Sequence, residues 1–351
     1  MIKAFKYRIY PNEEQREYFA KTFGSTRFVY NRMLSDKIEH YKLTGKTLKN
    51  TPAQYKEEFP WLKEVDSLAL ANAQMNLEKA YRNFFRDKSV GFPKFKSKKN
   101  NYRSYTTNNQ KGTVTLESGY IKLPKLKSMV KIRQHRPFDG LIKSCTISQN
   151  PSGKYFISLL VECEIEKYPR LETKVGIDVG VKTFAVLSDQ SVIENPKHLR
   201  KSEKRLAKLQ RDLSRKEKGS QNRAKARIKV AILHEKITHQ RLDFLQKISS
   251  KIISDNQAIV LEDLKIKNMV QNHKLAKSIS EVSWGMFRRM IEYKAEWYGR
   301  EVIIAPSNYA SSQLCSGCGN QSRQTKDLSC RTYICPTCGL EIDRDYNASL
   351  N

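Results

Sequence analysis

Two Cys-x-x-Cys pairs near the end of the chain constrain its fold more than any other feature. The pairs are Cys315–Cys318 and Cys335–Cys338, with 16 residues between them. Four thiolates at this spacing are the ligands of a structural, tetrahedral zinc site that has no open position for a substrate. We therefore predict a zinc ribbon over residues 312–341. A zinc-finger transcription factor is the alternative, but the ribbon occupies only a small part of the 351 residues.

The charge of the chain points to a polyanionic partner. Lys and Arg number 65 against 36 Asp and Glu, which gives a formal net charge of +29. Such an excess makes the free protein repel itself, and a nucleic acid is the natural counter-charge. The charge alone does not distinguish DNA from RNA. The alternative is a generally basic protein without a nucleic-acid partner.

The other cysteines and the hydrophobic runs bear on the compartment. Cys145, Cys163 and Cys330 are isolated, which suits a reducing compartment better than a disulfide framework. The first residues lack the continuous apolar segment of a signal peptide. No uncharged run approaches the roughly 18 residues that span a membrane. These features predict a cytoplasmic protein without a membrane partner.

The first half of the chain alternates between strand and helix patterns. Residues 2–10 alternate apolar and basic side chains and are typical of an edge strand. Asn12 and Gln15 have the spacing of a capping box, and the helix after them is expected to stop at Gly24. A second helix toward Gly45 and a third after Ser67 complete a helical unit. Short strands are expected from about 104 to 172, so the helical unit is predicted to be inserted into a β-barrel.

The second half has the pattern of an α/β layer structure. A strand over 175–180 and its hairpin partner over 182–188 precede two long basic helices that fill 197–255. Residues 258–261 form a short apolar run typical of a buried parallel strand. An amphipathic helix that begins near Trp284 and a strand over 302–305 follow, which is a strand–helix–strand unit.

Three acidic residues lie where such a sheet presents chemical groups. Asp178 and Glu262 each end an apolar strand, and Asp345 opens a predicted helix. Carboxylates at strand ends can hold hard divalent ions. Each acid also has an ordinary explanation, because Asp178 precedes a turn, Glu262 and Asp263 are typical of a solvated loop, and Asp343 is a plausible helix cap. Periodicity does not choose between Glu262 and Asp263.

A set of ordered motifs resembles the TnpB family of transposon-encoded, RNA-guided DNA nucleases, relatives of the type V CRISPR effectors. The resemblance covers nearly the whole chain. The motifs are Tyr7-Arg-Ile-Tyr-Pro11 with Gln15, Arg27-Phe-Val-Tyr-Asn31, Gly91-Phe-Pro-Lys-Phe-Lys96, Leu123-Pro-Lys125, Gly176-Ile-Asp178-Val-Gly180, Val260-Leu-Glu262-Asp-Leu264, Tyr309-Ala-Ser-Ser-Gln313 and Asp343-Arg-Asp345-Tyr-Asn-Ala348.

The resemblance implies a multidomain α+β protein. A wedge-type β-barrel (1–10 and 104–172) would hold an inserted helical recognition unit with a basic linker (11–103). A RuvC-like domain of the RNase H type (173–351) would follow and include the zinc ribbon. The family motifs assign catalysis and the binding of Mg²⁺, with two ions expected, to Asp178, Glu262 and Asp345.

Basic segments supply the expected nucleic-acid contacts. Residues 197–230 hold 14 Lys and Arg against 3 Asp and Glu, and such helices contact phosphates or are simply solvated. Lysines interleaved with aromatic residues in the linker could grip RNA, although a flexible basic linker is the alternative. The candidate contacts are Tyr30, Asn31, Lys56, Lys94, Lys96, Lys98, Arg205 and Arg211.

The sequence therefore predicts an RNA-guided DNA endonuclease encoded by an insertion sequence. The implied partners are a guide RNA from the transposon end and double-stranded target DNA beside a short transposon-adjacent motif. The alternative is a guided DNA-binding protein, repressor-like, with weak or no nuclease activity. A strand-transfer transposase is disfavoured, because none of the six His forms the paired motif that such chemistry needs. Family chains usually continue beyond Asp345, so the helix carrying it is expected to be short and poorly anchored.

Overall fold

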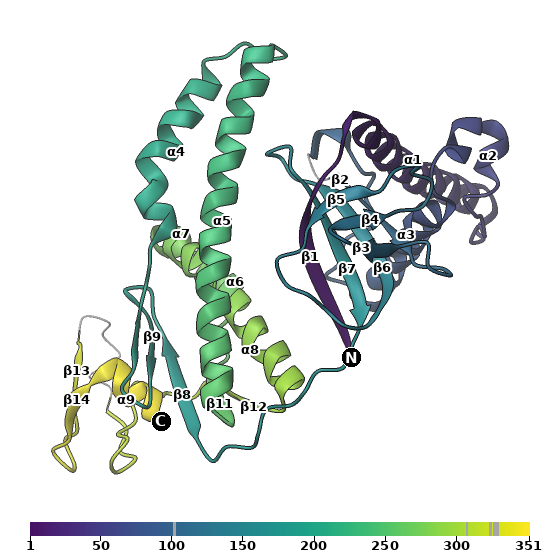
Figure 1. Cartoon of the computed structure of the whole chain (residues 1–351). Helices are drawn as coiled ribbons and strands as arrows, with labels where there is room; N and C mark the ends of the chain where they lie inside the picture. The colour runs from purple at the N-terminus through teal and green to yellow at the C-terminus, as the bar shows by residue number, and fades with distance from the viewer. Residues whose placement is uncertain (101–102, 307, 323–324, 326–329) are drawn as a thin grey trace. The chain divides into compact units, whose positions relative to one another are not determined.

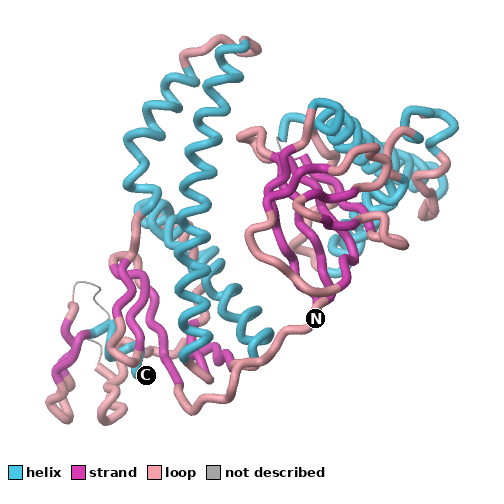
Figure 2. The backbone as a smooth tube through the Cα atoms, viewed as in Figure 1, coloured by secondary structure: helices cyan, strands magenta, loops and turns pink. Residues whose placement is uncertain are grey.

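The computed structural model describes residues 1–100, 103–306, 308–322, 325 and 330–351. It divides into two compact units, residues 1–164 and 165–351, and each is described by itself. Figure 2 shows that both units mix helices and strands, which confirms the α+β content. Among the described residues no helix is long and apolar enough to cross a membrane. The predicted domain boundaries remain predictions.

A seven-stranded antiparallel sheet forms the body of the first unit (Figure 1). Its order is β2-β6-β7-β1-β5-β4-β3, with β2 and β3 at the two ends, so the sheet is curled without being closed by hydrogen bonds. The strands are β1 (Ile2–Tyr10), β2 (Arg103–Asn108), β3 (Thr115–Glu117), β4 (Tyr120–Lys122), β5 (Val130–Arg133), β6 (Leu141–Gln149) and β7 (Tyr155–Glu162).

The prediction that residues 2–10 form an edge strand is wrong. β1 lies between β7 and β5 and pairs with both. Phe5, Tyr7 and Ile9 are buried on one face of the strand, while the basic residues between them lie on the other. Alternation reports that one face is buried, and an interior strand with one solvated face has the same pattern as an edge strand.

The helices between β1 and β2 are α1 (Glu13–Thr44), α2 (Tyr55–Glu58) and α3 (Ser67–Arg86). The predicted capping box is confirmed, because Asn12 and Gln15 exchange both hydrogen bonds. The predicted stop at Gly24 is wrong, and α1 continues to Thr44. Gly24 keeps ordinary helical backbone, and a glycine inside a helix costs only about 1 kcal/mol. Burial on both sides of it outweighs that cost.

Helix α1 contributes to two cores. Its first half packs Phe19 and Phe23 against Tyr105 of the sheet. Its second half packs Met33 against Leu70 of α3. One continuous helix therefore joins the sheet to the helical layer, which two separate helices could not do as rigidly.

The second unit contains a five-stranded mixed sheet with the order β10-β9-β8-β11-β12. β11 pairs in parallel with both β8 and β12, which confirms the predicted buried parallel strand, and β8 and β9 form the predicted hairpin. The strands are β8 (Lys174–Val179), β9 (Thr183–Leu187), β10 (Val192–Glu194), β11 (Ala258–Glu262) and β12 (Glu301–Ala305).

Helices cover one face of this sheet. Ile177 and Leu261 pack there with Ile252 of α5 and Phe287 of α8. The two long basic helices confirm the prediction for 197–255, with Gly219 in the turn between them. The helices are α4 (His198–Ser214), α5 (Gln221–Asp255), α6 (Ile266–Met269), α7 (His273–Val282) and α8 (Trp284–Tyr298).

The last segment consists of β13 (Thr332–Ile334), β14 (Glu341–Asp343) and α9 (Arg344–Leu350). β13 and β14 form a hairpin, and α9 lies against β8 and β9. The predicted ribbon range 312–341 includes residues 323–324 and 326–329, which lie outside the described residues.

Candidate functional site

The four cysteines come together at two turns of the same construction. In each, the residue after the second cysteine is a glycine at positive φ, Gly319 or Gly339, whose N–H donates to the carbonyl of the first cysteine. The N–H of the first cysteine in turn donates to the residue after that glycine, so each loop closes on itself. Only glycine adopts this left-handed backbone without strain. The Cys-x-x-Cys-Gly pattern thus produces each loop locally.

The cysteine sulfurs have the spacing of a tetrahedral metal site. Cys315 Sγ lies 3.6 Å from Cys338 Sγ, and Cys318 Sγ lies 3.6 Å from Cys335 Sγ. All four sulfurs lie within 4.8 Å of one another. Metal–sulfur bonds of about 2.3 Å in a tetrahedron require sulfurs about 3.8 Å apart. A hydrogen bond from the Cys338 N–H lowers the pKa of the Cys335 thiol to about 6, which favours the metal-binding thiolate.

Two of the predicted acids project from neighbouring parallel strands. The β8–β11 pairing aligns Gly176 with Val260 and Ile177 with Leu261, so Asp178 and Glu262 are the next residues on their strands. Paired residues of adjacent strands share a face and lie about 5 Å apart. Ile177 and Leu261 point into the helical core, so Asp178 and Glu262 project from the opposite face.

Helix α9 brings the third acid to that face. A Cβ atom on Gly176 would lie 2.0 Å from the Ser349 carbonyl oxygen, so the backbones of β8 and α9 touch where β8 has no side chain. Asp343 caps α9 by accepting hydrogen bonds from the N–H groups of Asp345 and Tyr346. The cap role considered for Asp343 is therefore confirmed, and its carboxylate is engaged by the helix terminus.

The electrostatics of Asp178 report that the three acids are neighbours. Burial, together with the negative charges of Glu262 and Asp345, raises the pKa of Asp178 to about 8, while Arg344 opposes the rise. A carboxylate that sits among others in a partly dry site is held protonated until a cation arrives. Asp263 points elsewhere and forms an ion pair of 2.6 Å with Arg288.

Two of the acids each form a polar contact with a residue outside the acidic set. Ser311 Oγ donates to Glu262 Oε1 at 2.5 Å, and Arg331 Nη1 lies 3.3 Å from Asp345 Oδ2. Among the described residues the four cysteines are the one set already gathered closely enough to hold a metal. No sequence motif includes Arg331, whereas Ser311 lies within the motif Tyr309-Ala-Ser-Ser-Gln313.

Helix α9 is anchored, so the expectation that it is poorly held is wrong, although its seven residues make it short. Asn347 is fully buried, donates to the Leu314 carbonyl at 2.6 Å and accepts from the Ser316 N–H at 3.0 Å. The amide of Asn351 also donates to the Leu314 carbonyl. The first cysteine loop therefore holds the helix that carries Asp345.

Asp178 and Asp345 line a cavity of about 540 Å³ with basic walls. Its cationic lining residues are Lys182, Lys197, Arg200, Arg331 and Arg344. A cavity that combines clustered carboxylates with surrounding cations can hold a metal ion together with a phosphate group.

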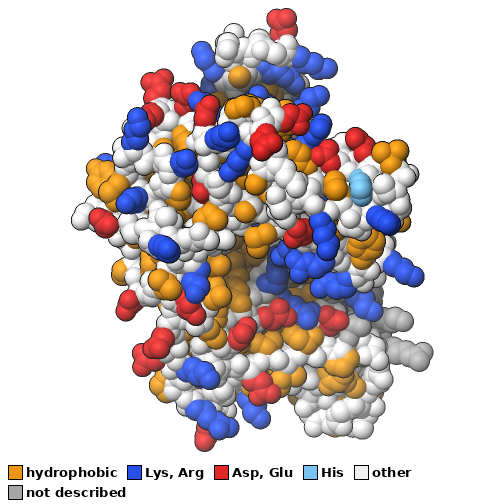
Figure 3. Space-filling model, turned by 90° about the vertical axis from the view of Figure 1, so that its right-hand side faces the viewer, with side chains coloured by type: hydrophobic (Ala, Val, Ile, Leu, Met, Phe, Trp, Pro, Cys, Tyr) orange, Lys and Arg blue, Asp and Glu red, His pale blue; other side chains and the backbone are white. Residues whose placement is uncertain are grey.

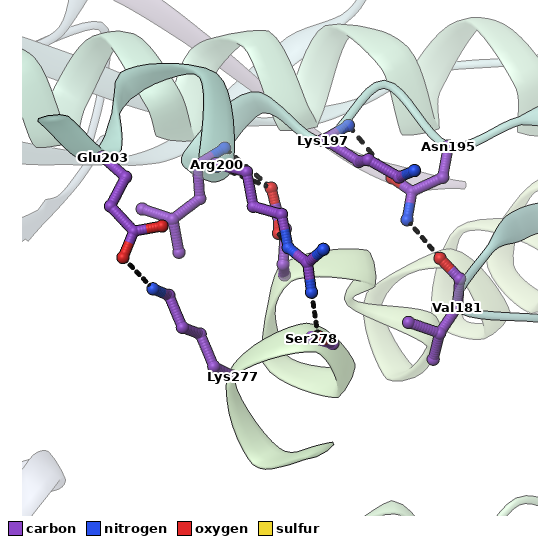
Figure 4. Close-up of polar contacts among 9 residues, drawn as sticks. Val181, Asn195, Lys197, Arg200, Glu203, Lys277 and Ser278 are labelled. Carbon is purple, nitrogen blue, oxygen red and sulfur yellow. Dashed lines mark hydrogen bonds and ion pairs between the residues drawn. The ribbon is translucent and has the colours of Figure 1, made fainter. Parts of the chain in front are cut away.

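Part of that wall is a junction between α4 and α7, shown in Figure 4. Arg200 reaches from α4 to Ser278 Oγ at 2.7 Å, and Lys277 pairs with Glu203. The buried Glu281 of α7 accepts from the N–H groups of Leu199 and Arg200, which caps α4 from another helix. Nearby, Asn195 donates to the Val181 carbonyl at 2.7 Å.

The predicted nucleic-acid contacts have mixed surroundings, and their roles remain predictions. Tyr30 is buried, and Asn31 binds the backbone of Lys96. Lys56 donates to Ser67 Oγ at 2.8 Å. The remaining candidates, Lys94, Lys98, Arg205 and Arg211, are exposed. Figure 3 shows many Lys and Arg side chains on one face of the molecule.

Family models match three parts of the chain. A model described as "Probable transposase" matches residues 158–273, and one described as "Cas12f1-like, TNB domain" matches 284–351. A model described as "Helix-turn-helix domain" matches residues 1–46, which here form β1 and the single helix α1.

Relatives match over nearly the whole chain. A protein of Streptomyces pristinaespiralis named "Putative RNA-guided DNA endonuclease" is 40% identical, over 99% of this chain and 88% of its own length. The Escherichia coli (strain K12) protein "Putative RNA-guided DNA endonuclease InsQ" is 33% identical, over 100% and 91%. In structure, the protein of a Cas12f1–sgRNA–target DNA complex aligns with a TM-score of 0.64 and 16% identity, over 97% of this chain and 82% of its own.

Proposed function

The chain belongs to the TnpB family of RNA-guided DNA endonucleases, and from that premise we propose that it cuts DNA by metal-dependent phosphodiester hydrolysis directed by a guide RNA. The guide would come from the end of the insertion sequence that encodes the protein, and the target would lie beside a short transposon-adjacent motif. The net charge of +29 supports a large polyanionic partner.

The observation that carries the proposal is that Asp178 and Glu262 project from one face of the sheet and that α9, which carries Asp345, packs against β8 on that face. These acids come from β8, β11 and α9, three segments far apart in the chain. Together with β8–β12 they support a RuvC-like arrangement for the second unit, with a wedge-type, barrel-like sheet and inserted helical recognition unit in the first. The cysteine cluster supports a structural zinc ion held by Cys315, Cys318, Cys335 and Cys338.

The three acids and the cationic wall of the cavity divide the work. Asp178, Glu262 and Asp345 would hold divalent ions of the Mg²⁺ type, which when bound supply positive charge to activate a water molecule and stabilise the leaving oxygen. Arg200 and Lys182 on the wall would attract the DNA phosphate. Ser311 engages Oε1 of Glu262 and Arg331 engages Oδ2 of Asp345, so the second oxygen of each carboxylate would bind the metal while these partners orient it.

Cleavage of matched DNA by the purified complex tests the proposal. The chain is purified with its co-expressed guide RNA and incubated with matched plasmid and Mg²⁺. Asp178→Asn should lower the cleavage rate by about 10³-fold or more, because several kcal/mol of charge stabilisation are lost. Binding of guide RNA and target should stay within about twofold of wild type, because the substitution removes no contact to either.

Two neighbouring acids provide matched controls. Asp263→Asn removes a carboxylate that pairs with Arg288, and Asp343→Asn keeps a side chain that can still cap α9. Both should cut at nearly the wild-type rate. Full cutting by Asp178→Asn would refute the assignment of the acids. A wild-type complex that binds matched DNA but never cuts it would instead favour the repressor-like alternative.

A further inference from the structure

A second basic pocket lies in the first unit, on elements that contribute nothing to the acidic site. It encloses about 370 Å³ between α1, the linker before β2 and the start of β2. Its charged lining residues are Arg27 of α1, Lys94 and Lys96 of the linker, and Arg103 of β2. We call it the α1–β2 pocket. Its volume lies within the range of about 300–1,000 Å³ that is usual for ligand sites.

The charge in the α1–β2 pocket is uncompensated. No Asp or Glu lines it. In the part of the chain that the structure describes, none of its four cations forms an ion pair with a carboxylate. Arg103 donates to Gln149 Oε1 at 2.9 Å, which is a neutral partner. Four cations gathered without counter-charge repel one another, so an anion bound among them would be stabilised.

The linker is held in place at the pocket. The side-chain amide of Asn31 donates to the Lys96 carbonyl at 2.9 Å and accepts from the Lys96 N–H at 2.8 Å. The Lys96 ammonium lies 4.0 Å from the centre of the buried Tyr30 ring. Partial loss of water lowers the pKa of Lys96, as expected for a cation with no acid beside it. The half-buried Asn31 and the buried Tyr30 thus position the linker.

One aromatic ring in the lining is free to stack. The Phe95 side chain is 55% exposed, although it lies between the anchored Lys96 and the pocket lysine Lys94. An exposed aromatic ring among cations suits a ligand with a negative group and a flat apolar face. A nucleotide has both, because its phosphate meets the cations and its base stacks on the ring.

We propose that the α1–β2 pocket binds one nucleotide of the guided complex, with its phosphate on Arg27 and Arg103 and its base on Phe95. The inference rests on the proposed function only in that the nucleic acid is the guide RNA or the target DNA. A ring stacks on an unpaired base or on the last base of a duplex, so the nucleotide belongs to a single-stranded segment or to the end of a paired one. Asn31 acts as a positioning residue that holds the linker ready.

Binding measurements on the full chain separate the two sources. Labelled guide RNA is titrated with the purified chain, and labelled target DNA is titrated with the preassembled complex, each at several salt concentrations. Arg27→Gln should weaken one of the two equilibria about tenfold and reduce its salt slope by about 1, because one phosphate contact is lost. If guide RNA binds more weakly, the nucleotide in the pocket belongs to the guide. If target DNA binds more weakly, it belongs to the target.

Two further variants test the stacking and the positioning. Phe95→Ala should weaken the same arm about fivefold or more while its salt slope stays unchanged, because a stacked base is lost and no charge is removed. Asn31→Ala should also weaken that arm without changing the slope. Lys79→Gln is the matched control, since Lys79 is an exposed lysine of the same unit outside the pocket.

The outcomes are decisive without any nuclease assay. If Arg27→Gln, Arg103→Gln and Phe95→Ala all bind both nucleic acids as Lys79→Gln does, the pocket holds no nucleotide. A melting temperature measured for each variant identifies any that has lost its fold. Phe95→Ala should keep the fold, because the Phe95 side chain is exposed. Failure of the wild-type chain to bind guide RNA at all would refute the proposed function instead.

Discussion

The cysteine cluster and the acidic cluster of the second unit are built in opposite ways. The four sulfurs are already within 4.8 Å of one another, because each pair sits in a loop that its own backbone closes. The three carboxylates depend on strand register and on the docking of α9, and Ser311 and Arg331 hold two of them. Among the described residues, the cysteines are gathered closely enough to hold a metal as they stand, whereas the carboxylates are not. The first cluster therefore depends on local loops and the second on the tertiary fold.

The largest effect should come from removing a cysteine. Cys335→Ser leaves three thiolates, so bound zinc should fall from about one per chain to a small fraction of that. Because the first cysteine loop holds α9 through Asn347, cutting should be lost as well. Zinc is measured by metal analysis and cutting by plasmid cleavage.

Cys330 supplies the control for the cysteine prediction. It lies outside the cluster, and Cys330→Ser should keep both zinc and activity. If Cys335→Ser cuts normally after losing its zinc, the two clusters are independent and the bracing role of the ribbon is wrong.

The contact between β8 and α9 should give the next largest effect. Gly176→Ala places a methyl group 2.0 Å from the Ser349 carbonyl, so the helix must move away and Asp345 with it. A displacement of about 1 Å can cost a factor of 10² in rate, and we expect a loss of that size. Guide binding should be unaffected, because Gly176 and Asp345 belong to the second unit, whereas the basic linker belongs to the first.

Gly24→Ala is the matched substitution at a glycine with open space around it. Since Gly24 lies inside α1 with ordinary helical backbone, alanine should stabilise the protein by about 0.5–1 kcal/mol. Chemical denaturation measures this change. A destabilised Gly24→Ala would mean that α1 is interrupted there, as the sequence pattern indicates.

Asn347 tests the anchor of α9 more gently. Asn347→Ala leaves the Leu314 carbonyl and the Ser316 N–H with fewer partners in a buried place, which should cost about 1–3 kcal/mol. We expect roughly tenfold slower cutting, the size of effect seen when a supporting hydrogen bond to a metal site is removed. Zinc content should stay unchanged, because no ligand is lost. Loss of zinc together with activity would show that α9 supports the ribbon rather than the reverse.

The smallest effect is a pH dependence of stability in the absence of divalent ions. The pKa of Asp178 is about 8 in the folded state and near 4 in the unfolded state, so the folded state holds its proton more tightly. The stability from this group is therefore complete below about pH 4 and is lost as the pH rises toward 8. Asp178→Asn removes the loss, so its melting temperature should exceed that of wild type by several degrees more at pH 8 than at pH 5.

Magnesium should reverse the difference at pH 8, raising the melting temperature of wild type but not of Asp178→Asn. Equal pH profiles for the two proteins would mean that burial and the neighbouring acids do not raise the pKa of Asp178. That result would break the contrast between the clusters.

Local patterns in the sequence predicted what local forces determine. The capping box of α1, the turn at Gly219 and the loop of each cysteine pair depend on residues near one another, and the sequence predicts all of them. The place of β1 and the length of α1 were missed, because they are decided by packing against distant segments. Glu262 is preferred over Asp263 because it directly follows the apolar run of β11, and the register with β8 supports that preference.

The partners of the acids were beyond the reach of sequence reasoning. Arg331 contacts Asp345 because the β13–β14 hairpin places the two residues on adjoining segments. The spacing of the two residues in the sequence does not predict this contact. At the α1–β2 pocket, the amide of Asn31 joins two segments 65 residues apart in the chain. Such juxtapositions follow from the tertiary fold alone.

The cap of α4 has a consequence for the order in which the chain folds. The first turn of α4 has no cap of its own and relies on Glu281, which lies 82 residues after Leu199. At about 5–20 residues per second, a ribosome needs roughly 4 to 16 s to make that stretch. Throughout this interval the first turn of α4 lacks its cap, and it gains the cap only when α7 emerges. The wall of the acidic cavity is thus among the last parts of the nascent protein to take shape.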